Sequence, residues 1–201
     1  MITSTNWGSE SKIEARRATI IEPYYKAFKR KNIPPNTQYW TMCGRCATPQ
    51  GKLVEGCELD YLTKIGFIKP NQFHGVEISP QTHKDNLKLT QANFYQGMMQ
   101  FNISKAQNPA IINFDHHLSI NQIKGQLISL LNYLKPHKDI MLVINLLKKY
   151  RTVNDTDEHI MKQITSIDQI VDYEVISLYE YNGVQDNNTT EMLSVTLVKN
   201  N

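Results

Sequence analysis

The sequence predicts an α/β fold: a doubly wound, mostly parallel seven-stranded sheet that ends in an antiparallel hairpin, with helices on both faces. Apolar runs of strand length alternate with segments of helical periodicity over most of the chain. The strongest run, "IMLVINLL" at 140–147, is apolar throughout, as expected of a parallel strand covered on both sides. Two strand-like segments at the carboxyl end, 171–183 and 192–199, predict the hairpin.

An amino-terminal helical extension, residues 1–35, precedes the α/β domain, residues 36–201. Within "ESKIEARRATIIEPYYKAFKRK" apolar residues recur between charged ones, which predicts an amphipathic helix. Pro23 bends or divides this helix, because proline lacks the N–H that an α-helix needs. The segment "NIPPN" then ends it and forces an extended connection into the first strand.

Strand and helix signals alternate through the α/β domain. The segment "TQYWTMCG" is β-branched and aromatic and ends in glycine, which predicts the first strand. Ser79 and Pro80 are typical of a helix cap and first turn. The polar segment 184–190 predicts the hairpin loop. The expected strands are 38–43, 72–79, 93–97, 109–117, 138–147, 171–183 and 192–199, and the expected helices after the extension are 57–67, 80–91, 120–134 and 157–167.

Composition places this chain of 201 residues, 40% of them hydrophobic, among single globular domains. Three cysteines cannot all pair, and no signal segment opens the chain, so we expect a reduced, cytoplasmic protein. No apolar run reaches the roughly 20 residues that span a bilayer, so we expect no membrane partner. The net charge is +3, but the segment 12–31 is locally basic. It is either a solvated helix face or a contact for nucleic acid.

All three cysteines lie in "CGRCATPQGKLVEGC", at positions 43, 46 and 57. With His74 they would make a three-cysteine, one-histidine zinc shell. A second CxxC or HxxxH that would close such a site locally is missing, so we predict free thiols and no metal. A redox pair is disfavoured too, since the predicted helix starts near residue 57, too far along to lower a thiol pKa at Cys43.

The order of elements, with "CGRC", "FHGVEIS" and "INFDHHL" at strand ends, resembles the class I methyltransferase fold over residues 36 to 200. The resemblance implies S-adenosylmethionine as cofactor, bound outside the carboxyl ends of the parallel strands. It implies that Cys43 and Gly44 border the methionine part and that Glu77 receives the ribose hydroxyls. Gly97 and Met98 would form an adenine slot, although Met98 stands where the family has an acid. The family's E/D-x-G-x-G pattern is otherwise absent.

The end of the fourth predicted strand supplies the groups that would meet the methyl acceptor. The resemblance implies Asp115 or His116 as a general base, with Asn113 orienting the acceptor and bordering the cofactor. The alternative for these residues is a helix cap and solvated histidines. The missing glycines also leave open a non-catalytic binding or scaffold protein on the same fold, for example a viral one. A third hypothesis is a nucleic-acid-binding module that uses the segment 12–31.

Overall fold

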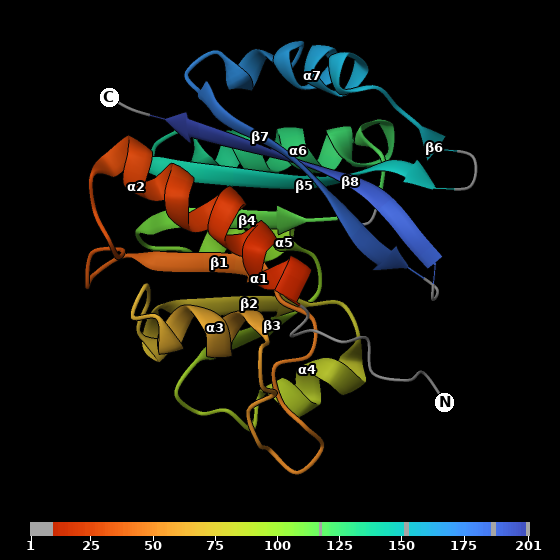
Figure 1. Ribbon diagram of the computed structural model, residues 1–201. Helices are drawn as coiled ribbons and strands as arrows, with labels where there is room; N and C mark the ends of the chain where they lie inside the picture. The colour runs from red at the N-terminus through yellow and green to blue at the C-terminus, as the bar shows by residue number, and fades with distance from the viewer. Residues whose placement is uncertain (1–9, 117, 151–152, 186–187, 200–201) are drawn as a thin grey trace.

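The computed structural model describes residues 10–116, 118–150, 153–185 and 188–199, and places them in one sheet with helices on both faces (Figure 1). The strand order is β3-β2-β1-β4-β5-β8-β7. The predicted seven-stranded α/β fold is therefore confirmed. The strands are β1 Gln38–Met42, β2 Phe73–Glu77, β3 Asn93–Gln96, β4 Pro109–Asp115, β5 Ile140–Tyr150, β7 Glu174–Gln185 and β8 Asn188–Lys199, and a two-residue β6, Val153–Asn154, pairs with the end of β5.

The helices follow the predicted alternation, with one addition, the short α5 after β3. Residue 117, at the end of the predicted fourth strand, lies outside the described residues. The helix predicted at 120–134 has those bounds, because apolar residues recur along one face and Ser119 caps its first turn. The helices are α1 Glu10–Arg16, α2 Glu22–Phe28, α3 Glu58–Lys64, α4 Pro80–Asn86, α5 Met99–Asn102, α6 Ile120–Leu134 and α7 Asp157–Thr165.

Strands β1 to β5 are parallel, whereas β8 is antiparallel to both β5 and β7. The predicted hairpin is thus present, but its loop is shorter than expected. Pairing continues to Gln185 and Asn188, so polar residues of the segment 184–190 extend the strands. Backbone pairing needs no apolar side chain, and Thr189 and Thr190 are β-branched residues that favour strands.

Two hydrophobic cores lie on opposite faces of the sheet. One contains Ile112 and Leu142 and is covered by α6 and α7; the other contains Ile111 and Met141 and is covered by α1, α2 and α3. Successive residues of a strand point to opposite faces. Strands β4 and β5 are therefore apolar at every position of their buried middle, as the sequence predicted.

The amino-terminal helix packs on the sheet over β7 and β8 (Figure 1). A five-residue π-helical turn, Arg17–Ile21, separates α1 from α2, and Pro23 stands in the first turn of α2. Pro23 cannot donate the N–H that an α-helix would supply to the carbonyl of Thr19. Thr196 Oγ1, on β8, donates to this carbonyl oxygen at 3.0 Å. The predicted irregularity at Pro23 is therefore joined to the sheet by a buried hydrogen bond.

Among the described residues, no helix has the length and apolar character needed to cross a membrane.

Candidate functional site

The carboxyl ends of β1, β2, β3 and β4 meet at one edge of the sheet, beside the start of α1 (Figure 1). Each strand is followed by one or more of the residues that the sequence singled out. Ligands of open parallel sheets bind outside this edge, where the loops diverge at the switch in strand order. Here that switch lies between β1 and β4: from β1 the chain adds β2 and β3 on one side, and from β4 it adds β5 on the other.

The loop after β1 has a defined conformation that one side chain imposes. Gly44 has φ 57°, a left-handed conformation that glycine adopts without strain. The fully buried Asn86, the last residue of α4, donates from Nδ2 to the Gly44 carbonyl at 2.8 Å. Its Oδ1 accepts from the N–H groups of Cys46 and Ala47 at 2.8 and 3.1 Å. Asn86 therefore fixes the loop, and no local signal in the sequence indicated this role.

The three cysteines are buried and free. A hydrogen bond with the Cys43 thiol, together with burial, raises the pKa of Cys46. A hydrogen bond with Cys46 and burial raise the pKa of Cys57, whose sulfur also caps α3 by accepting from the N–H of Asp60 at 3.4 Å. Cys46 and Cys57 thus pack as protonated, weakly polar groups behind the loop.

The fourth member of the hypothetical zinc shell lies on the other face of the sheet. The ring of His74 stacks on Trp40, with centroids 4.7 Å apart, and its Nδ1 lies 3.0 Å from the hydroxyl of Tyr95. Trp40 belongs to the core under α6, whereas the cysteines belong to the core under α3. The fold therefore does not bring His74 and the cysteines together.

Glu77, the last residue of β2, is partly buried at the sheet edge. Its Oε1 accepts from the N–H of Ser79 at 2.7 Å, which orients the carboxylate, and Ser79 in turn caps α4. Within the described part of the chain, Oε2 has no hydrogen-bond partner. The carboxylate of Glu77 is thus oriented through Oε1, and Oε2 can accept a hydrogen bond from a ligand.

A glycine with a left-handed backbone conformation stands beside Glu77, at the end of β3. Gly97 has φ 112° and donates its N–H to the Glu77 carbonyl at 3.0 Å. Met98 is 38% exposed at the start of α5, whereas Met99 is fully buried. Glu77, Gly97 and Met98 are therefore neighbours at the edge, next to the loop that holds Gly44.

The polar end of β4 divides between the two faces of the sheet. Asn113 and Asp115 alternate with Phe114, which belongs to the core under α6. The ring of His116 packs edge-on against Phe114, with centroids 4.3 Å apart. His116 therefore lies on the opposite face from Asp115, and the structure separates the two residues proposed as alternative bases.

The amide of Asn113 takes part in a buried network. Its Nδ2 donates to Thr41 Oγ1 at 3.3 Å and to Glu58 Oε1 at 3.1 Å, and its Oδ1 accepts from Asn145 Nδ2 at 2.8 Å. The Tyr39 hydroxyl donates to the same oxygen of Glu58. A role for Asn113 toward a cofactor or acceptor, which remains a prediction, would require it to exchange one of these bonds.

Asp115 faces a second set of polar groups. Its Oδ1 is buried and lacks a hydrogen-bond partner among the described residues, as does the hydroxyl of Ser194. Both residues are register neighbours of Asn145 across β4, β5 and β8. Burial raises the pKa of Tyr181 well above its usual value, and the nearby carboxylates of Asp115 and Glu58 raise it further.

Arg16 supplies positive charge to this cluster from α1. Its Nη1 donates to the carbonyl of Gly56 at 3.2 Å, and its guanidinium opposes the effect of the two carboxylates on Tyr181. The sequence suggested Arg16 only as part of a basic surface, and it did not indicate Tyr181 or Glu58. Their roles depend on which strands and helices become neighbours.

No family model matches the sequence, and the search of curated proteins found no match either. Solved structures do match the fold. The plantazolicin methyltransferase BamL, solved with a triazolic desmethylPZN analog and SAH, has a TM-score of 0.60 at 15% identity, covering 96% of this chain and 86% of BamL. Magnesium protoporphyrin IX methyltransferase ChlM from Synechocystis PCC 6803, with bound SAM, has a TM-score of 0.54 at 10% identity, covering 98% of this chain and 85% of that one.

A third match is the N-methyltransferase NodS from Bradyrhizobium japonicum WM9, with a TM-score of 0.51 at 10% identity, covering 96% of this chain and 99% of that chain. These likenesses extend over nearly the whole chain, and they establish the class I methyltransferase fold that the sequence resembled.

Proposed function

We propose that this protein is an S-adenosylmethionine-dependent methyltransferase. The observation that carries the proposal is the fold itself, shared over 96% of the chain with a methyltransferase solved with SAH. Fold alone does not determine activity, so the residues at the strand ends must also suit the cofactor. Three features of the edge support this.

The first feature is Glu77, whose Oε2 is available at the end of β2 and suits a ribose hydroxyl. The second is Gly44, whose positive φ angle marks a place where the chain has no Cβ to obstruct a ligand; at Gly97 a Cβ would instead meet Asn102 Nδ2 at 3.4 Å. The third is Met98, which is 38% exposed and offers an apolar side chain for adenine. These features support a cofactor site at this edge in which Met98 stands where the family resemblance implies an acid.

When bound, S-adenosylmethionine supplies an electrophilic methyl group on a sulfonium sulfur. In this proposal Asp115 accepts a proton from the acceptor, and the support for it is that its Oδ1 is buried and has no hydrogen-bond partner among the described residues. An acceptor with an N–H or O–H group, such as an amine or an alcohol, would satisfy this carboxylate oxygen.

Cofactor binding tests the proposal without knowledge of the acceptor. Calorimetry with S-adenosylmethionine and S-adenosylhomocysteine should give micromolar affinity for the parent protein. Glu77→Ala should weaken it by about 1.5 to 3 kcal/mol, the scale of a hydrogen bond to a charged group. Glu158→Gln, which changes an exposed carboxylate on α7, is the control and should bind like the parent.

Two outcomes would contradict the proposal in different ways. Absence of binding by the parent would favour the non-catalytic alternative. Binding that Glu77→Ala leaves intact would show that the ribose contact is misassigned. With an acceptor in hand, Asp115→Asn should keep cofactor affinity and lower turnover, because the amide keeps the shape of the carboxylate and cannot take the proton.

A further inference from the structure

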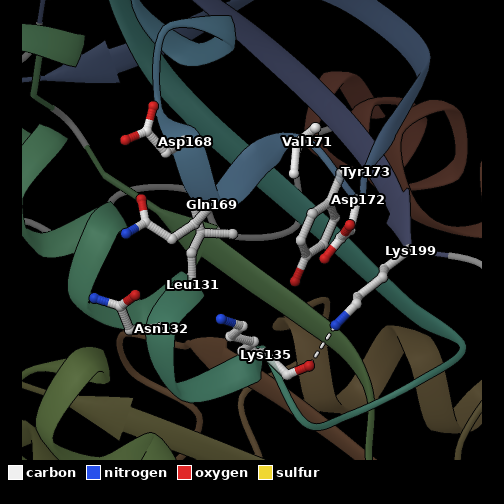
Figure 2. A pocket seen from close by; sticks show the side chains of 9 residues that line it. All are labelled: Leu131, Asn132, Lys135, Asp168, Gln169, Val171, Asp172, Tyr173 and Lys199. Carbon is white, nitrogen blue, oxygen red and sulfur yellow. Dashed lines mark hydrogen bonds between the residues drawn. The ribbon is translucent and has the colours of Figure 1, made fainter.

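A second candidate ligand site lies at the opposite end of the sheet. Lys199 ends β8 and pairs with Ile140, the first residue of β5, so this end holds the amino ends of the parallel strands. A pocket of about 250 Å³ opens there between the end of α6, the short 3₁₀ turn Asp168–Ile170 and the start of β7 (Figure 2). It is lined by Leu131, Asn132, Lys135, Asp168, Gln169, Val171, Asp172, Tyr173 and Lys199.

Lys199 is an unusual residue to find in this wall, because it is only 7% exposed. Buried lysines normally have a carboxylate partner, since an unpaired buried charge is costly. Lys199 has no ion pair within the described residues. Its Nζ donates one hydrogen bond, to the carbonyl of Lys135 at 2.5 Å, at the end of the 15-residue helix α6.

The hydrogen bond to the carbonyl at the end of α6 compensates only part of the positive charge of Lys199. The partial negative charge of a helix C-terminus amounts to about half an elementary charge. An ammonium also has three N–H donors, and the Lys135 carbonyl uses one. Lys199 therefore retains both positive charge and donors that no described protein group satisfies.

Tyr173 contributes a second unsatisfied group to the same pocket. Its hydroxyl is buried and has no hydrogen-bond partner among the described residues. Burial and the nearby Asp172 carboxylate raise the pKa of Tyr173, so the phenol stays protonated and can donate. Figure 2 shows this hydroxyl and the Lys199 ammonium directed into the pocket. The exposed Asp172 carboxylate lies beside them without an ion pair to Lys199, and the carboxylate of Asp168 points away.

We infer that this pocket binds a small oxyanion, a carboxylate or a phosphate, through Lys199 and Tyr173. The anion would supply the counter-charge that Lys199 lacks and an acceptor for the Tyr173 hydroxyl. The buried Leu131 offers an apolar wall for a short organic part. The pocket volume lies below the roughly 300–1,000 Å³ of sites for drug-sized ligands, so the ligand is small.

Titrations of the full chain with sodium phosphate and with sodium acetate, at constant ionic strength made up with sodium chloride, test the inference. Backbone amide NMR shifts should saturate and should be confined to residues 131–135, 168–173 and 198–199. The two salts distinguish phosphate from carboxylate. Shifts that do not saturate with either salt, or that scatter over the surface, would overturn the inference.

Variants separate a ligand site from a structural contact. Tyr173→Phe removes a hydroxyl that bonds to nothing described, so a purely structural residue would tolerate it, whereas anion affinity should fall by roughly 2- to 13-fold. Lys199→Met should weaken binding by roughly 10- to 150-fold, the range for a charged hydrogen bond. Lys138→Met, at an exposed lysine nearby, should change nothing. Unchanged affinity in Tyr173→Phe would refute the assignment.

Discussion

Replacing Asn86 by alanine should destabilise the protein and weaken cofactor binding together. The substitution removes a weak hydrogen bond to Cys43 Sγ at 3.8 Å and three hydrogen bonds to backbone, with the Gly44 carbonyl and with the N–H groups of Cys46 and Ala47. Each of the three backbone bonds contributes about 0.5 to 1.5 kcal/mol net, so the free energy of unfolding should fall by about 1.5 to 4.5 kcal/mol. The loop after β1 would also lose its fixed conformation, so affinity for S-adenosylmethionine should fall as well.

Urea unfolding followed by tryptophan fluorescence measures this change, because Trp40 is fully buried in the core beside β2. The control is Asn121→Ala, which changes an exposed asparagine in the first turn of α6 and should alter stability by less than about 0.5 kcal/mol. If Asn86→Ala unfolded at the same urea concentration as Asn121→Ala, the hydrogen bonds of Asn86 would not hold the loop.

Three further predictions concern other parts of the fold. Burial lowers the pKa of His74 to about 4, so between pH 6.5 and 4 the unfolded chain binds more protons than the folded protein. The free energy of unfolding should therefore fall as the pH falls from 6.5 to 4. In the His74→Phe variant, the free energy of unfolding should depend less steeply on pH over this range. Thr196→Val should cost about 1 to 3 kcal/mol in denaturant unfolding, because the buried Thr19 carbonyl loses its donor, and no loss would mean that this carbonyl is satisfied otherwise. If the acceptor is nucleic acid, replacing the exposed Arg17, Lys29 and Arg30 by alanine should weaken binding to all sequences alike and flatten its salt dependence in filter-binding assays. Arg16 is left unchanged because it bonds to Gly56. Unchanged binding would mean that this basic segment serves packing alone.

The sequence alone carried the order of the elements. Patterns that extend over a few neighbouring residues report burial directly, as in the unbroken apolar run of β5 or the capped, periodic α6. Strand ends follow from the same patterns, so Gly44, Glu77 and Asp115 could be placed at one edge before the structure was known. Such local signals do not show how a side chain's polar atoms are occupied, and the bonds of Asn113 were therefore not foreseen.

The neighbours of each residue were decided only by the tertiary structure. His74 pairs in register with Trp40 and packs on the Trp40 face of the sheet, away from the cysteines. Alternation along β4 likewise separates His116 from Asp115. Tyr181 comes within electrostatic range of Asp115 although β5 and β8 lie between their strands, an arrangement that no local pattern encodes. Lys199 and Tyr173 line one pocket for the same reason: contacts between distant segments depend on how the whole sheet assembles, whereas periodicity reports only whether each segment is buried.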